Sequence, residues 1–182
     1  SSMPQPAARD GEILNVKAEK LYLPADGASI SALSTGTFVL LEGTVYTARD
    51  QAHKRIAQAI KDGAELPFEL TGAAIYYCGP TPAPDGCVIG SCGPTTSGRM
   101  DAYSPLLIER GLKIMIGKGV RNEQVTQAIK AHAAAYLTAN ARPPAQYQSK
   151  VKTCEQIAYP ELGCEAVYKL TVKDFPAVVS IV

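Results

Sequence analysis

The sequence has no excess of charge of either sign and no long apolar run. Its 182 residues carry 18 Lys and Arg against 17 Asp and Glu, which gives a formal net charge of +1. Bulk charge therefore gives no support for a polyanionic partner such as a nucleic acid. No apolar run approaches the roughly 18 residues that a membrane helix needs. We expect neither a nucleic acid nor a membrane as partner.

The N-terminus also lacks the apolar core of a secretory signal, which favours the cytoplasm as the compartment. Residues 1–12 are predicted to form a flexible arm, in which Ser1 and Ser2 resemble a tag remnant. With 46% hydrophobic and 19% charged residues, the chain has an ordinary globular composition. We expect residues 13–182 to form one domain, because this length can enclose a real core.

Common metal and nucleophile patterns are missing. The five cysteines form no CxxC pair and match no common zinc spacing, and their odd number argues against a disulfide framework. We expect free thiols and keep metal binding by Cys78, Cys87 and Cys92 as an alternative. Only two histidines, His53 and His132, are present, and no Ser-His-Asp order or paired-carboxylate signature accompanies them.

The order of the expected elements indicates a mixed α/β fold. Extended patterns come first, at 13–17 and 35–48, the latter as two strands around Gly43 or as one strand bent there. Helical and strand-like segments then alternate, and extended patterns return after residue 151. Such an order predicts an α/β domain with a mixed, partly parallel sheet.

Two segments have the spacing of amphipathic helices. In residues 49–63, apolar side chains recur on one helical face, Asp50 is placed to cap the start, and Gly63 is placed to end the helix. Residues 122–138 predict a second helix, with His132 packed in the core.

Three cations stand at comparable places in the predicted sheet. Arg49 and Lys118 each follow a strand-like segment, and Arg99 lies in the loop that follows a third. Because strand-end loops of α/β sheets meet at one edge, these cations converge if the strands are parallel neighbours. An arginine grips a carboxylate through two N–H groups and a lysine adds a point charge, so the set suits a small dicarboxylate. The alternative is that each cation is a solvated surface residue or a salt-bridge partner.

The loop GSCGPTTSGRMD between a strand and a helix is a second candidate for anion binding. It offers backbone N–H groups and the hydroxyls of Thr95, Thr96 and Ser97. It is not a phosphate-binding Walker loop, since GxxxxGK[ST] is absent, and an ordinary tight turn is the alternative. His53 lies one turn after Arg49 and either faces the same cleft or occupies a solvated helix position.

Several long motifs together resemble one family. They are similar to the C-terminal domain of the class I fumarase and L(+)-tartrate dehydratase family, which in two-subunit members is the separate beta subunit. The resemblance covers roughly residues 20–182 and is carried by GTVYTARDQAHKRI, IYYCGPTPAP, IGSCGPTTSGRMDAYSPLLIERG, MIGKGVR and AYPELGCEAVYKLTVKDFPAVV.

The resemblance implies a swivelling β/β/α domain and a hydro-lyase that reversibly hydrates fumarate to malate or dehydrates tartrate. It also implies a [4Fe–4S] cluster that is ligated by the alpha subunit or N-terminal domain and by none of the cysteines here. The expected partners are this alpha subunit, in a heterotetramer of two alpha and two beta subunits, and a small dicarboxylate substrate. The alternative is a stand-alone module that binds a dicarboxylate or phosphate without catalysis.

The resemblance also assigns roles to individual residues. Arg49, Arg99 and Lys118 are expected to bind the substrate carboxylates, and Thr95 is expected near the proton that is abstracted. A threonine is a poor base at its free pKa, so Thr95 acts only if its neighbours stabilise the alkoxide. The residues expected to support these groups are Asp50, His53, Thr96 and Asp101.

Overall fold

The structure is a computed structural model that describes residues 18–139 and 147–182. The expected arm at 1–12 and the expected strand at 13–17 lie outside these residues, and the first described strand starts at Ala18. No helix in the described ranges combines the length and the apolar character needed to cross a membrane.

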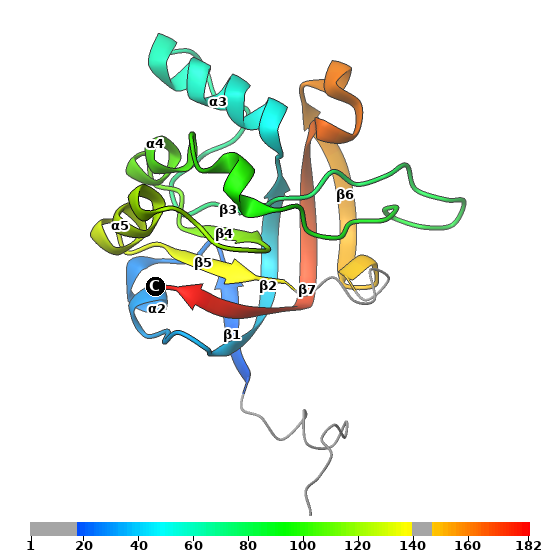
Figure 1. Cartoon of the computed structure of the whole chain (residues 1–182). Coiled ribbons are helices and arrows are strands. Elements are labelled where there is room, and N and C mark those ends of the chain that lie inside the picture. The colour runs from blue at the N-terminus through cyan, green and yellow to red at the C-terminus, as the bar shows by residue number, and fades with distance from the viewer. Residues whose placement is uncertain (1–17, 140–146) are drawn as a thin grey trace, which may run out of the picture.

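Seven strands of the described chain form one sheet whose pairings close on themselves (Figure 1). The strands are β1 (Ala18–Leu23), β2 (Phe38–Thr47), β3 (Ala74–Tyr76), β4 (Ile114–Gly117), β5 (Ala135–Thr138), β6 (Val151–Ala158) and β7 (Val167–Ile181). Strands β1 to β5 are parallel neighbours, whereas β7 runs antiparallel to β5, β2 and β6. The pairing of β2 with β7 closes a ring, and the predicted mixed, partly parallel sheet is confirmed.

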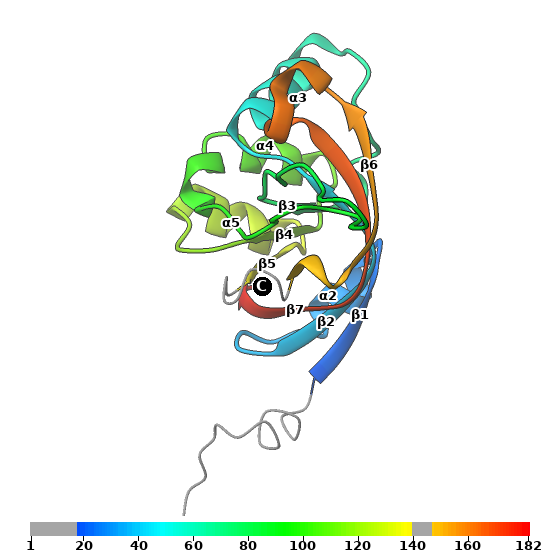
Figure 2. The same cartoon turned by 90° about the vertical axis from the view of Figure 1, so that its right-hand side faces the viewer.

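Three helices pack against one face of the parallel strands. They are α3 (Asp50–Asp62), α4 (Ser104–Glu109) and α5 (Glu123–Ala131). Figure 2 shows them on one side of the molecule and the curved strands β1, β2, β6 and β7 on the other. Other helical segments include α2 (Gly27–Ser31) and the short 3-10 helices η1 (Ser97–Met100) and η2 (Pro160–Glu165).

Alternation along β3 divides the interior into two cores. Ile75 and Tyr77 point to the helices, where they join Ile56 of α3 and Leu107 of α4. Tyr76 points to the opposite face and joins the side chains of β1, β2 and β7. A short strand buried on both faces explains why this segment is apolar throughout.

Strand β2 is one strand bent at Gly43, as the second of the two alternatives predicted. Its register against β7 shifts between Leu41 and Gly43, and Gly43 has φ 133°. A Cβ at Gly43 would meet the backbone oxygen of Leu23 on β1, so the bend requires a glycine.

Helix α3 agrees with the prediction except at its first residue. It ends at Asp62 with Gly63 in the left-handed conformation, as expected. Asp50 lies inside the first turn, however, and Arg49 occupies the N-cap position. The prediction that Asp50 caps the helix is therefore wrong.

The predicted helix at 122–138 is too long. Helix α5 ends at Ala131, Ala133 has φ 53°, and residues 135–138 form β5 between β4 and β7. His132 is exposed and does not pack in the core. The sheet provides pairing partners for these residues, and this tertiary contact outweighs the helix propensity of the alanine run.

Gly43→Ala is expected to destabilise the chain by about 3 kcal/mol, because the new methyl group meets backbone atoms that no side-chain rotation can move. Gly36→Ala is the matched control, since Gly36 also has positive φ (91°) but no atom within 4 Å of its Cβ position. The control should lose only about 1 kcal/mol. Urea unfolding of both variants measures the difference, and equal losses would contradict the close packing of β1 on β2.

Candidate functional site

The carboxyl ends of β2, β3 and β4 lie side by side at one edge of the sheet. The Ala48 N–H donates to the Tyr76 carbonyl (3.2 Å), and the Tyr77 N–H donates to the Ile116 carbonyl (2.8 Å). The three strands are parallel neighbours, so the condition under which the cations converge is met. Arg49 lies at this edge, separated from the end of β2 by Ala48 alone.

The loop that carries Thr95 enters between the ends of β3 and β4. The Thr95 N–H donates to the Tyr77 carbonyl (2.7 Å), and the Ser97 N–H donates to the Lys118 carbonyl (2.8 Å). A Cβ at Gly117 would collide with Ser97 Oγ and the Tyr77 ring, so the loop needs a glycine at the end of β4. Thr95 thus lies at the end of β3, and the isolated bridge between Thr96 and Lys118 extends this pairing.

An ion pair links the Arg99 side chain to the start of α3. Arg99 Nε lies 3.2 Å from Asp50 Oδ2, and the Arg99 side chain is 51% exposed. At such exposure an ion pair contributes little to stability. The ion pair instead determines where the Arg99 side chain lies. Because Asp50 is the chain neighbour of Arg49, the pair brings Arg99 to the same sheet edge as Arg49.

Three buried polar atoms near this edge have no hydrogen-bond partner among the described residues. They are Arg49 Nε, Asp50 Oδ1 and His53 Nε2, from the N-cap and the first turn of α3. Buried polar atoms are paired in the great majority of cases, so three orphans in one turn require an explanation. The side chain of Arg49 runs against Gly79, where an added Cβ would lie 3.0 Å from Arg49 Cδ.

His53 is fully buried and packs against Tyr77 and Tyr103, so a solvated position is wrong. Its Nδ1 lies 2.9 Å from the Arg49 carbonyl, which only accepts, and Nδ1 therefore carries the hydrogen. Its ring packs edge-on against Tyr77, with centroids 5.4 Å apart. Burial, together with the charge of Arg121, lowers the pKa of His53 to about 4. The imidazole is therefore neutral at neutral pH.

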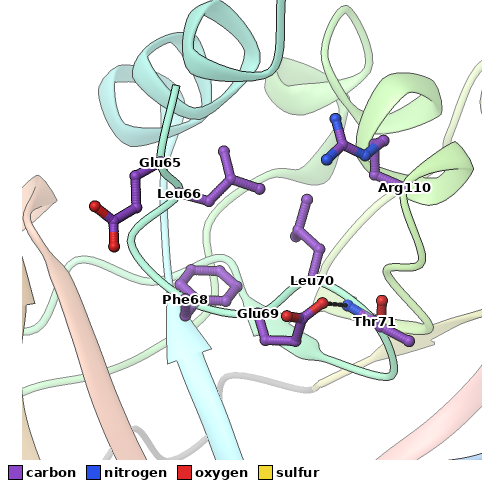
Figure 3. A pocket seen from close by; sticks show the side chains of 7 residues that line it. All are labelled: Glu65, Leu66, Phe68, Glu69, Leu70, Thr71 and Arg110. Atoms are coloured by element: carbon purple, nitrogen blue, oxygen red, sulfur yellow. Dashed lines mark hydrogen bonds between the residues drawn. The ribbon is translucent and has the colours of Figure 1, made fainter. Parts of the chain in front are cut away.

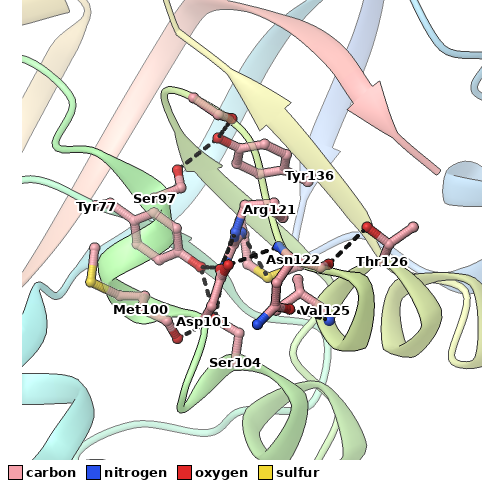
Figure 4. Close-up of polar contacts among 12 residues, drawn as sticks. Tyr77, Ser97, Met100, Asp101, Ser104, Arg121, Asn122, Val125, Thr126 and Tyr136 are labelled. Atoms are coloured by element: carbon pink, nitrogen blue, oxygen red, sulfur yellow. Dashed lines mark hydrogen bonds and ion pairs between the residues drawn. The ribbon is translucent and has the colours of Figure 1, made fainter.

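A buried arginine connects the loops behind this edge (Figure 4). The Arg121 side chain is 0% exposed, and its Nε lies 2.7 Å from Asp101 Oδ1. Its Nη2 donates to Ser104 Oγ (2.9 Å) and the Tyr77 hydroxyl (3.2 Å). The guanidinium carbon lies 4.7 Å from the centroid of the Tyr136 ring, a cation–π distance.

Asp101, one of the expected supporting residues, is engaged within this cluster. Its Oδ2 accepts from the Asn122 N–H (2.8 Å), while Oδ1 pairs with Arg121. Arg121 itself was missed by sequence reasoning, although the motif MIGKGVR contains it. The motif was the one sequence signal that could have pointed to Arg121. The motif does not reveal that Arg121 is buried, because the burial arises where β3, β5 and α4 meet around the side chain.

The cysteines do not form a metal site in the described chain. Residues 18–139 and 147–182 contain no group of three or more His, Cys, Asp or Glu that could hold a metal ion. All five cysteines are free, as expected, with Cys78 and Cys92 buried and Cys87 exposed. Burial raises the pKa of the Cys78 thiol, which keeps it protonated and disfavours metal binding.

A pocket of about 410 Å³ lies away from the predicted site residues (Figure 3). Its lining precedes β3 and β4, so it lies at the amino ends of the strands, opposite to the edge that carries Arg49. The lining residues are Glu65, Leu66, Phe68, Glu69, Leu70, Thr71 and Arg110.

Comparisons with known proteins agree with one another. A family model described as "Fumarase C-terminus" matches residues 2–182. The aerobic class I fumarate hydratase of Escherichia coli K12 is 42% identical over 152 residues, which cover 82% of this chain and 28% of that protein. Fumarate hydratase 2 of Leishmania major is 43% identical, over 81% of this chain and 26% of that protein.

A shorter relative is covered over most of its length. The putative L(+)-tartrate dehydratase subunit beta of Methanocaldococcus jannaschii is 34% identical over 151 residues, which cover 80% of this chain and 77% of that subunit. The chain therefore spans less than a third of the two fumarate hydratases but most of this separate subunit.

Asp101→Asn is expected to destabilise the chain by about 3 kcal/mol, because it leaves the buried Arg121 charge without its carboxylate. Asp174→Asn breaks an exposed ion pair with Lys20 and is the control, for which we expect little change. Urea unfolding measures both. A loss at Asp101 as small as that at Asp174 would show that Arg121 does not depend on this carboxylate.

His53 is expected to make stability depend on pH. Since the pKa of His53 falls from 6.5 to about 4 on folding, the unfolded chain binds more protons between these values. The contribution of His53 to the free energy of unfolding is fully present above pH 6.5. It falls by about 3 kcal/mol as the pH drops towards 4.

The measurement is urea unfolding at about pH 7 and about pH 4.5, compared between variants. His53→Asn keeps an N–H donor for the Arg49 carbonyl and should remove this part of the pH dependence. His132→Asn changes the exposed histidine and should leave the dependence intact. Equal pH dependence in the wild type and in His53→Asn would refute the neutral, buried imidazole.

Proposed function

The chain belongs to the Fumarase C-terminus family, and we propose that it is the C-terminal part, or beta subunit, of a [4Fe–4S]-dependent hydro-lyase. The proposed reaction is the reversible hydration of fumarate to malate or the dehydration of tartrate, in the cytoplasm. The names of the fumarate hydratase and tartrate dehydratase relatives support this reaction class. Because the chain spans only 28% of the first fumarate hydratase, we propose an alpha partner, in a heterotetramer of two alpha and two beta subunits.

The buried, unpartnered Arg49 Nε is the observation that carries the proposal. An N–H group that has no acceptor within the described chain suits a carboxylate oxygen from outside it. Arg99 and Lys118 lie at the same sheet edge with exposed side chains. Two arginines and a lysine carry three positive charges, and the Asp50 carboxylate paired with Arg99 leaves two of them to match a small dicarboxylate. Each guanidinium can form paired hydrogen bonds with a carboxylate.

Thr95 is proposed to face the carbon from which the proton is removed. Its backbone is held at the end of β3, and its side chain is half-buried, so its position is well defined. The hydroxyl needs nearby positive charge to act as a base, and Arg99 and Lys118 are the candidates for supplying it. Asp50 would hold Arg99 in place, His53 would hold the backbone of Arg49, and Thr96 would hold Lys118.

The residues of this chain that the structure describes do not fit a [4Fe–4S] cluster. The ranges 18–139 and 147–182 hold no group of three or more ligating side chains, and Cys78 and Cys92 lie in the apolar interior. We therefore propose that the alpha partner ligates the [4Fe–4S] cluster and that this chain supplies carboxylate-binding and proton-transfer groups.

Arg99→Lys in the complete enzyme is expected to raise the KM for fumarate by about 10- to 100-fold, because lysine cannot form the paired contact with a carboxylate. Arg49→Lys should behave alike. Arg110→Lys is the control, since Arg110 lines the pocket at the opposite end of the strands, and its KM should equal that of the wild type. Anaerobic steady-state assays measure all three, and a normal KM in both site variants would remove them from the substrate site.

A second assay distinguishes a half-site from a stand-alone module. The chain is purified alone and with its alpha partner under anaerobic conditions, and fumarate hydration is followed in each sample. We expect activity only from the combination. Robust hydration by the isolated chain would contradict the half-site, and micromolar binding of malate or phosphate by it would favour a binding module.

A further inference from the structure

Helix α3 begins without a capping side chain of its own. Arg49 occupies the N-cap position with extended backbone angles (φ −113°, ψ −158°), and its side chain makes no capping hydrogen bond in the described structure. Ser, Thr, Asp or Asn at this position would offer an oxygen to the amides of the first turn, whereas arginine has only donors. The residue proposed to bind substrate therefore leaves the start of its own helix without a local acceptor.

Glu165 provides the missing acceptor from a distant part of the chain. Its Oε1 accepts a hydrogen bond of 3.0 Å from the Gln51 N–H, across 114 positions of sequence. Gln51 is the second residue of α3, so the carboxylate occupies the place of a capping oxygen. A negative charge at this end also interacts favourably with the helix dipole.

Further contacts hold η2, which ends at Glu165, against α3 (Figure 2). Arg55 Nη2 lies 2.8 Å from Glu161 Oε2, and the Arg55 guanidinium carbon lies 5.1 Å from the centroid of the Tyr159 ring. These contacts lie one turn further along the helix than Gln51. The two side chains of this ion pair are 45% and 57% exposed, so the pair adds little stability, and it does not touch the residues at the sheet edge.

Gly79 is where this turn approaches the Arg49 side chain. A Cβ at Gly79 would lie 3.0 Å from Arg49 Cδ and 3.0 Å from the carbonyl oxygen of Cys164. Cys164, the residue before Glu165, and the aliphatic part of the Arg49 side chain therefore lie against the same glycine. The turn thus contacts both the start of α3 and the side chain that leaves it.

We propose that Glu165 is a positioning residue for Arg49, an inference that rests on the proposed function of Arg49 in binding a substrate carboxylate. By capping α3 at Gln51 and holding the turn beside Gly79, Glu165 sets the direction in which the guanidinium leaves the helix. Glu165 itself does not contact substrate. Its loss should weaken substrate binding while leaving the chemical groups of the site in place.

The test compares three variants in the complete enzyme, assayed anaerobically with fumarate. Glu165→Ala removes the acceptor and should raise KM about fivefold, with kcat within about twofold of the wild type. Glu165→Gln keeps a carbonyl oxygen for the Gln51 N–H and should restore a KM near that of the wild type. Glu161→Ala is the matched control in the same turn, with a side chain that is 57% exposed and pairs with Arg55, and its KM should not change.

Hydrogen–deuterium exchange of the peptide that covers the start of α3 gives a readout that does not depend on activity. We expect exchange there to be about tenfold faster in Glu165→Ala and near the wild-type rate in Glu165→Gln and Glu161→Ala. Unchanged exchange, or a normal KM, in Glu165→Ala would overturn the positioning role. A wild-type complex that neither hydrates fumarate nor dehydrates tartrate would instead overturn the proposed function, so the two failures are distinguishable.

Discussion

Two backbone hydrogen bonds at the ends of β3 and β4 determine the geometry of the candidate site. They run from Thr95 to Tyr77 and from Ser97 to Lys118, and they insert a loop between two strands whose last mutual pair is Tyr76 with Ile116. The insertion is possible only because Gly117 has no side chain. Once the loop is inserted, its threonine, the arginine that follows it and the lysine after β4 lie at one sheet edge. Parallel strands thus gather residues that are far apart in sequence at one place.

The three arginines of this region differ in how their charge is compensated, and Arg99 pairs with Asp50 at the surface. Arg121 is enclosed by two tyrosine rings and paired with Asp101, so its charge is compensated inside the protein. Arg49 keeps a buried N–H without a partner in the described chain. His53 adds no charge between them, because burial holds its pKa at about 4. The uncompensated positive charge is thereby confined to the sheet edge, where a dicarboxylate would need it.

Local signals predicted the elements that position the site, and contacts between distant segments account for the errors. Helical periodicity and Gly63 predicted α3, and the alternation of strand-like and helical segments predicted the partly parallel sheet. The end of α5 was missed because no glycine marks it, and His132 was misplaced as a result. The first turn of α3 receives its acceptor from a glutamate over a hundred positions away, so no local pattern could predict it. The burial of Arg121 likewise depends on strands from different parts of the chain.

The proposal that this chain forms one half of a dicarboxylate site is tested most directly by a crystal structure of the complete enzyme with bound malate. We expect malate at the interface with the partner, with its carboxylates on the guanidinium groups of Arg49 and Arg99 and the Lys118 ammonium nearby. We also expect an acceptor for Arg49 Nε, which has none in the described chain. Malate bound within the partner alone, out of reach of these three residues, would contradict the half-site.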